Sequence, residues 1–349
     1  MVARCIVNPH HALVDVPAPA SPAVLRFHEG LPGYHPTPLR ALHDVGWGAV
    51  HVKDESDRFG LPAFKILGAS WAVEQALAAE PTTPLLVAAS AGNHGRAVAR
   101  AAAQRSVACR ILLPGTVSQA RANLIADEGA QITRVNGDYD AAVAAAHRAA
   151  DARGVTLIAD TGTAASASWV VDGYATLFRE AASQSTDPFD LVIVPIGVGS
   201  LAASAVRFAV HQRPGAAVIG VEPVTAACVT ASLQAGDAVT VDTPGTTMTG
   251  MDCATPSPAS WPTLRAGLNG TITISDTEAH RAMREFAAHG VVAGDCGAAT
   301  IAALHALRGD ARCRSVRDAT RFGRSTRVLC VNTEGASDPV AYASVVDPR

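Results

Sequence analysis

Short apolar segments alternate with alanine-rich, helix-forming segments along most of this 349-residue sequence. The apolar segments predict buried strands at 48–54, 85–90, 107–114, 131–137, 156–160, 191–197, 216–223 and, with its following loop, 328–335. The clearest predicted helices are 66–79, 96–105, 118–129, 138–154, 169–184 and 201–212. Because strands that are separated by helices pair in parallel, the pattern predicts an α/β chain with mostly parallel sheets. Ligand sites are then expected at the carboxyl ends of the strands.

Two segments interrupt this alternation. The stretch 244–262 is rich in Pro, Gly, Thr and Ser, which predicts a long functional loop near a binding site. The stretch 314–327 is basic and polar, and we expect a solvated, partly mobile connector there.

Composition excludes several classes of protein. Hydrophobic residues make up 48% of the chain, enough for a sizeable core, and the 28 basic against 31 acidic residues include no basic patch for nucleic acid. No apolar run is long enough to span a membrane, and the N-terminus does not resemble a signal peptide. The seven cysteines show no CxxC spacing. We therefore expect reduced thiols, no metal site and a cytoplasmic location.

Lys65 is the first candidate for chemistry. It follows Phe64 in DRFGLPAFKILGAS (57–70), at the start of an apolar, small-residue helix. An ammonium among apolar side chains loses hydration, so its pKa is expected to fall. A neutral amine is the form that a Schiff-base lysine needs. Alone, this pattern is also typical of an ordinary exposed lysine at a helix start.

Three loops that follow predicted strands supply further polar groups. GVGSL (197–201) joins a strand to a helix, and its glycines allow backbone N–H groups to approach one phosphate group closely. It is neither GxGxxG nor a P-loop, which counts against a dinucleotide or a triphosphate. SAGNHG (90–95) carries the Asn93 amide, and VNTEG (331–335) carries the Thr333 hydroxyl. Each loop alone could be a simple turn.

Together these groups describe one cofactor, pyridoxal 5′-phosphate (PLP). The lysine would form the Schiff base, the glycine loop would hold the phosphate, and the amide and hydroxyl would face the phenolic oxygen and the ring nitrogen. With these motifs in view, the sequence resembles the fold-type II, or tryptophan synthase β-type, PLP enzymes, and within them the diaminopropionate ammonia-lyase family. The resemblance spans 32–339 and is most specific in DESDRFGLPAFKILGAS and MTGMDCATPSPASWP.

The resemblance implies two three-layer α/β domains with mostly parallel sheets, in a homodimer. Residues 1–67 and 188–349 would form the large PLP-binding domain, and residues 68–187 the small domain. It also implies a role for each site residue: Lys65 as the covalent attachment point, Asn93 at the cofactor's 3′-oxygen, Gly197, Val198, Gly199, Ser200 and Leu201 at the phosphate, and Thr333 at the ring nitrogen.

Two positions bear on the substrate. Asp160 matches an acidic position of the ammonia-lyases, which implies a catalytic role at the substrate amine or in proton transfer, although alone it could cap the following loop. The ammonia-lyases have an aspartate two residues before the asparagine, which resembles a base for D-substrates, whereas this chain has Ala91. That difference counts against turnover of a D-isomer. The stretch ASAGNH (89–94) is instead similar to threonine dehydratases.

The resemblance therefore implies β-elimination from a small amino acid such as L-2,3-diaminopropionate, giving a 2-oxo acid and ammonia. A serine/threonine dehydratase-like activity, or β-replacement on a pathway-specific substrate, stays open. So do a PLP-carrying protein without catalysis and a nucleotide-binding α/β protein.

Overall fold

The computed structural model describes residues 4–42, 48–82, 84–212 and 216–347, and the strands among them form two sheets. The larger sheet has the order β1-β10-β9-β8-β11-β3-β2 and the smaller one β6-β5-β4-β7. The strands of the larger sheet are β1 (Cys5–Val7), β2 (Leu39–Leu42), β3 (Ala49–Asp54), β8 (Leu191–Pro195), β9 (Ala217–Pro223), β10 (Gly270–Ile274) and β11 (Arg327–Asn332). Those of the smaller sheet are β4 (Leu85–Ala89), β5 (Ala108–Pro114), β6 (Gln131–Val135) and β7 (Val155–Leu157).

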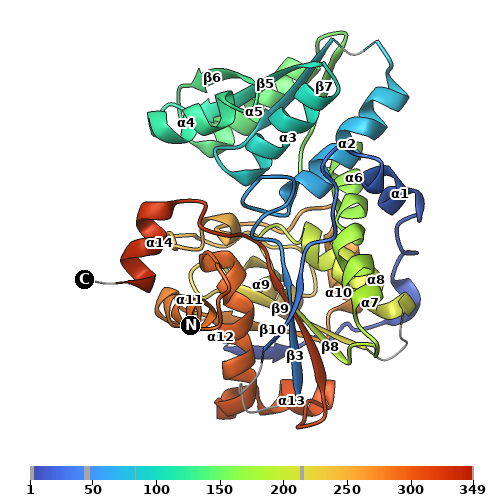
Figure 1. Cartoon of the computed structure of the whole chain (residues 1–349), viewed down its shortest axis with the longest axis vertical. Coiled ribbons are helices and arrows are strands. Elements are labelled where there is room, and N and C mark those ends of the chain that lie inside the picture. The colour runs from blue at the N-terminus through green and yellow to red at the C-terminus, as the bar shows by residue number, and fades with distance from the viewer. Residues whose placement is uncertain (1–3, 43–47, 83, 213–215, 348–349) are drawn as a thin grey trace.

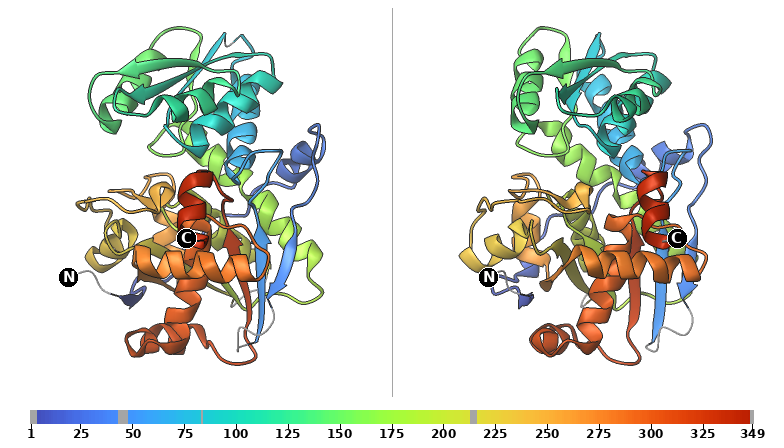
Figure 2. Two further views of the ribbon diagram at one scale, coloured as in Figure 1. Left: turned by 60° about the vertical axis from the view of Figure 1, so that its left-hand side comes forward. Right: turned by 90° about the vertical axis from the view of Figure 1, so that its left-hand side faces the viewer.

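Most strand pairs are parallel, as the alternation of strands and helices predicts. The exceptions are edge strands, because β1 runs antiparallel to β10 and β2 runs antiparallel to β3. Figures 1 and 2 show the smaller sheet with its helices above the larger sheet in every view. The predicted α/β class with mostly parallel sheets is confirmed.

Helices cover both faces of the larger sheet. Alternate residues of β8 point to opposite sides, so Val192 and Val194 join one core while Leu191 and Ile193 join another. The first core is covered by α8 (Ser200–Gln212), with α7 (Ala175–Gln184) and α10 (Trp261–Gly267) packed on it. The second is covered by α11 (Asp276–Ala288), α12 (Asp295–Gly309) and α13 (Arg314–Thr320).

The smaller sheet is also enclosed on both faces. α5 (Tyr139–Ala150) packs on one face, and α3 (Asn93–Gln104) packs on the other with α2 (Lys65–Ala79) behind it. α4 (Gln119–Ala126) contacts α3, and α6 (Ala165–Gly173) packs closely along α2. The remaining helices are α1 (Ala23–Glu29), α9 (Cys228–Ala235) and α14 (Pro339–Val346).

A buried cluster of charges fixes the segment that leads to α2. Arg58 is 1% exposed and pairs with Glu55 at 2.6 Å and with Glu180 of α7 at 2.8 Å. Lys53 of β3 is fully buried and lies 2.6 Å from the same Glu180 carboxylate. A buried charge is tolerated only when it is paired in this way. The residues of the DESDR motif therefore hold the chain in place just before Lys65.

Several predicted boundaries differ from the structure. The predicted helix 169–184 is two helices, α6 and α7, which meet at Tyr174. The predicted loop 90–95 is shorter, because α3 already begins at Asn93. The polar segment 314–327 is more regular than a connector, because its first half forms α13 and buries Val316. Strand β10 was not predicted, because its alternating Thr and Ile residues do not form a continuous apolar run.

One cysteine pair differs from the expectation of reduced thiols. Cys5 of β1 and Cys313 form a disulfide, with Cα atoms 5.1 Å apart. The residues are far apart in the sequence, so no short spacing marks the pair. The free thiols are those of Cys109, Cys228, Cys253, Cys296 and Cys330.

The domain boundaries at 67/68 and 187/188 stay a prediction. All strands of the smaller sheet lie within 68–187, whereas α2 begins at Lys65 and runs across the first boundary. Among the described residues, no helix is both long and apolar enough to cross a membrane.

Candidate active site

Lys65 and Asp160 face each other from different parts of the fold. Lys65 begins α2, and Asp160 lies three residues beyond the end of β7. The Lys65 Nζ donates a hydrogen bond to the Asp160 Oδ2 at 3.0 Å. The two side chains are only 21% and 17% exposed, so the pair is largely shielded but can still be reached.

This ion pair reverses the expected shift in the pKa of Lys65. Burial alone would lower the pKa of Lys65, but the neighbouring Tyr174 and Asp160 raise it above its usual value. Burial likewise opposes ionisation of Asp160, yet His94 and the Lys65 ammonium lower the pKa of this carboxyl below its ordinary range. The expectation of a depressed lysine pKa is therefore wrong for this structure, and the pair is an ammonium and a carboxylate.

Asn93 and the Thr333–Glu334 strand end come together from two different sheets. Asn93 follows β4 at the start of α3, and its Nδ2 donates to the Oε2 of Glu334 at 2.9 Å. Thr333 follows β11 and is 4% exposed. Its Oγ1 is buried and has no hydrogen-bond partner among the described residues. A buried hydroxyl without a partner is costly, so this atom fits a ligand group that would complete its hydrogen bonding.

The predicted phosphate loop joins β8 to the start of α8. Gly199 has a φ of +100°, a conformation that L side chains rarely adopt. A Cβ added at Gly197 would lie 2.7 Å from the Gly250 carbonyl oxygen. Ser200 begins α8, and its Oγ donates to the Asp160 carbonyl at 2.9 Å. The loop therefore places the N-terminus of α8 beside the backbone that carries Asp160.

The expected long loop does lie against this site. The Ser257 N–H donates to the Val198 carbonyl at 2.8 Å, and the Cys253 Sγ is 3.2 Å from the position of a Cβ at Gly197. Burial raises the pKa of the Cys253 thiol to about 12, so the thiol stays protonated at neutral pH. This segment closes one side of the phosphate loop.

Sequence reasoning missed other residues that surround Lys65. Tyr174 is fully buried, its hydroxyl has no hydrogen-bond partner among the described residues, and burial raises its pKa to about 12. Tyr139 begins α5, and burial and the nearby Asp160 charge raise its pKa above the usual value, while the Lys65 charge opposes the shift. Neither tyrosine stands in a motif. The rarity of lysine is a further signal for Lys65. Only two of the 28 Lys and Arg residues are lysines, and the other one, Lys53, is buried.

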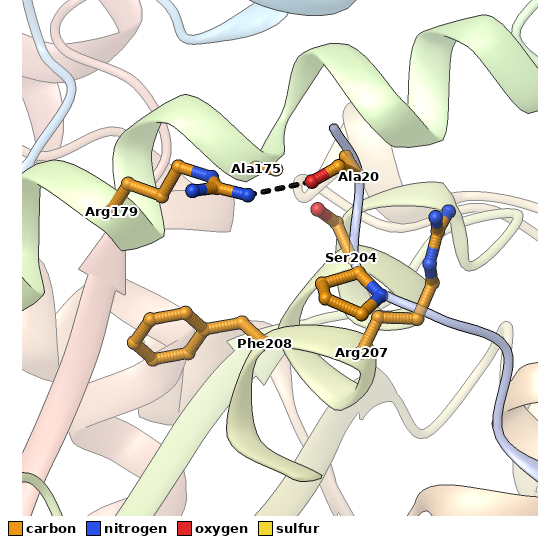
Figure 3. Close-up of a pocket in the computed structure, with 7 residues that line it drawn as sticks. Ala20, Ala175, Arg179, Ser204, Arg207 and Phe208 are labelled. Atoms are coloured by element: carbon orange, nitrogen blue, oxygen red, sulfur yellow. Dashed lines mark hydrogen bonds between the residues drawn. The ribbon is translucent and has the colours of Figure 1, made fainter. Parts of the chain in front are cut away.

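A separate hollow lies between α7 and α8, beneath the N-terminal segment that includes Ala18, Pro19 and Ala20 (the N-terminal arm). Figure 3 shows Arg179 from α7 and Arg207 from α8 on either side of Ser204, with the Arg179 side chain bonded to the Ala20 carbonyl at 2.6 Å. Arg207 donates to the carbonyl of Ala18 at 2.7 Å. Both arginines therefore hold the arm in place, and none of the predicted site residues lines this hollow.

The described residues form no group of three His, Cys, Asp or Glu side chains that could hold a metal ion. The groups that are present fit PLP instead. They are a lysine that can be reached, a glycine loop at a helix N-terminus and a buried hydroxyl without a partner. The three lie at the carboxyl ends of strands or at the start of α2, where the parallel sheets direct ligands.

Comparison with known proteins agrees with this chemistry. A family model described as pyridoxal-phosphate dependent enzyme matches residues 31–334, and the chain belongs to that family. It is 35% identical over 367 residues to the diaminopropionate ammonia-lyase of Salmonella typhimurium, covering 93% of this chain and 91% of the relative. It is 28% identical to an L-threonine dehydratase of Corynebacterium glutamicum, covering 89% of this chain and 70% of the relative.

Solved structures are similar as well. The crystal structure of the Escherichia coli diaminopropionate ammonia-lyase in complex with an aminoacrylate-PLP azomethine intermediate superposes with a TM-score of 0.89 at 29% identity. This match covers 100% of this chain and 98% of the other. The predicted PLP cofactor and fold-type II architecture are confirmed. The roles of the individual site residues stay predictions.

The phosphate loop gives a first test. We expect Gly199→Ala to weaken binding of PLP by roughly tenfold or more, because a side chain at this positive φ costs about 1–3 kcal/mol and would overlap Leu264. The measurement is an absorbance titration of the apoenzyme with PLP. Gly309→Ala, at the exposed end of α12 with open space around it, is the matched control. Unchanged PLP affinity in a folded Gly199→Ala protein would contradict the assignment of this loop.

Proposed function

We propose that this protein is a PLP-dependent ammonia-lyase that acts on a small amino acid such as L-2,3-diaminopropionate and releases a 2-oxo acid and ammonia. The observation that carries the proposal is the Lys65–Asp160 pair, 3.0 Å apart in a shielded site next to the glycine loop. Support comes from the similarity to enzymes of that name over more than nine-tenths of the chain.

Lys65 would hold the cofactor covalently, Asn93 would contact its 3′-oxygen and Thr333 its ring nitrogen. The loop of Gly197, Val198, Gly199, Ser200 and Leu201 would bind the phosphate. When bound, PLP withdraws electrons from the substrate Cα, which makes the Cα proton easier to remove. Because Thr333 offers only a hydroxyl, it cannot fully protonate the ring, and this favours elimination over transamination.

Lys65 and Asp160 would divide the proton transfers between them. The Lys65 amine would take the proton from the substrate Cα in its neutral form, so the ammonium that pairs with Asp160 must first lose its proton. The Asp160 carboxylate binds the second nitrogen of the substrate as an ammonium and keeps it protonated, because an amine leaves readily only in that form. The lowered pKa of Asp160 fits this role, since the group has to be ionised to bind a cation.

Ala91 leads to a prediction about stereochemistry. It is partly buried near the start of α3 and carries no acid or base. We expect release of 2-oxo acid from L-2,3-diaminopropionate but not from the D-isomer, measured with a coupled dehydrogenase assay. Ala91→Asp should raise D-isomer turnover at least about tenfold while leaving the L-activity in place, since a positioned base contributes about 10²–10⁴-fold. Efficient D-isomer turnover by the unmodified protein would exclude this reading of Ala91.

The same assay separates the alternatives. Faster turnover of L-serine or L-threonine would favour a dehydratase, for which the similarity to L-threonine dehydratases gives support. Products that contain an added thiol or amine would favour β-replacement.

A homodimer, which the family resemblance supports, and a cytoplasmic location are also part of this proposal. Light scattering tests the dimer. Thiol titration with and without reductant tests whether Cys5 and Cys313 are paired in the cellular protein.

A further inference from the structure

We propose that Glu334 is a positioning residue that fixes the orientation of the Asn93 amide, and through it favours the ionised form of the cofactor's 3′-hydroxyl. This inference rests on the placement of Asn93 at the cofactor in the proposed function. It concerns a carboxyl group that the mechanism above does not use.

Glu334 is held in place on several sides. Its backbone carbonyl accepts from the Gly294 N–H at 3.0 Å, and it pairs with Ala63 in an isolated antiparallel bridge. The neighbouring Thr333 carbonyl accepts from the Phe64 N–H at 3.2 Å. The strand end that carries Thr333 and Glu334 is therefore bonded directly to the segment before Lys65.

The side chain of Glu334 points to the Asn93 amide. Its Oε2 accepts from the Asn93 Nδ2 at 2.9 Å, and the Ser337 Oγ is a weaker donor to the same oxygen at 3.4 Å. A carbon added at Gly294 would lie 3.0 Å from the Glu334 Cγ and Oε1, so the glycine leaves room for this side chain. The contact joins the carboxyl ends of β4 and β11, which belong to different sheets.

An asparagine amide can present either its NH₂ or its oxygen to a ligand, and its neighbours decide which. Burial raises the pKa of Glu334, while hydrogen bonds from Cys296 and from the Asn93 amide lower it. In its ionised form the carboxylate only accepts hydrogen bonds, so Glu334 then holds the Nδ2 of Asn93 on its side. The second N–H of the same nitrogen is then available as a donor. A donor stabilises an ionised phenolic oxygen, whereas the amide oxygen would favour the protonated hydroxyl.

The test is the absorbance of the holoenzyme at fixed pH, since ionised and protonated 3′-hydroxyl forms of the bound cofactor absorb in the visible and the near ultraviolet. We expect Glu334→Ala to raise the proportion of the near-ultraviolet form about three- to tenfold, the effect of one lost hydrogen bond. Glu334→Gln keeps an acceptor and should restore most of the visible band. Ser337→Ala removes only the weaker donor and should leave the spectrum unchanged.

Asn93→Ala separates this inference from the proposed function. We expect it to raise the near-ultraviolet form as Glu334→Ala does, and the double variant to show no further rise, because both changes remove one interaction. If Asn93→Ala alters the spectrum but Glu334→Ala does not, the role of Glu334 is overturned and the placement of Asn93 stands. If Asn93→Ala leaves the spectrum unchanged, both the role of Glu334 and the placement of Asn93 at the cofactor's 3′-oxygen are overturned. If Glu334→Gln and Glu334→Ala equally favour the ionised form, repulsion by the charge acts instead, and this also overturns the proposal.

Discussion

Lys65→Ala is expected to abolish turnover and covalent attachment of PLP. The chain has only two lysines, and the other, Lys53, is fully buried and bound to Glu180. No other side-chain amine can therefore replace Lys65. Reduction of the holoenzyme with borohydride, followed by peptide mass spectrometry, should find the cofactor adduct at Lys65 in the unmodified protein and no lysine adduct in the variant.

Lys65→Arg provides the matched control. It keeps a positive charge beside Asp160, and so preserves the ion pair, but a guanidinium does not form a Schiff base. We expect this protein to fold and melt like the parent, and to be inactive. A reduced adduct on Lys53 or on the N-terminal amine, or none at all in the unmodified protein, would contradict the assignment of Lys65.

The sequence allowed the fold class and the location of the site to be predicted because both depend on local patterns. Buried strands such as β8 are continuous apolar runs, and the loops that follow β4, β8 and β11 carry glycines and polar residues that stand out from them. Parallel pairing brings the loops after β8 and β11 to one edge of the larger sheet, and the Asn93–Glu334 contact joins the loop after β4 of the smaller sheet to them. Strand β10 was not predicted, although its alternating Thr and Ile residues are typical of a half-exposed strand; in the structure all of its residues are buried.

What could not be predicted depends on contacts between distant residues. The pKa of Lys65 was expected to fall because its sequence neighbours are apolar, but the group that determines its charge, Asp160, is 95 residues away. Tyr174 is also distant from Lys65 in the sequence. It reaches Lys65 because Gly68 and Gly173 let α2 and α6 approach closely. Glu334 lies in the VNTEG loop, and nothing near it in the sequence indicates its contact with Asn93, which is 241 residues away.

Asp160→Asn is the second change with a large expected effect. We expect it to lower turnover of L-2,3-diaminopropionate by about 10²–10⁴-fold, because the amide cannot bind and retain the proton of the leaving nitrogen as a carboxylate does. PLP should still attach, because Lys65 is intact. Loss of the carboxylate also removes one of the charges that raise the pKa of Lys65, so the free amine becomes available at a lower pH.

Two measurements on the purified proteins test this. Steady-state release of 2-oxo acid gives the loss in kcat/KM, and the rate of PLP attachment to the apoenzyme as a function of pH should shift to lower pH in Asp160→Asn. Asp172→Asn is the matched control, since Asp172 forms a partly exposed ion pair with Arg207 and does not belong to the site. Near-normal turnover by Asp160→Asn would show that Asp160 pairs with Lys65 in the apoenzyme but takes no part in the reaction. The proton of the leaving nitrogen would then have to be held by another group at the site, and Tyr139 and the cofactor phosphate would be the next to test.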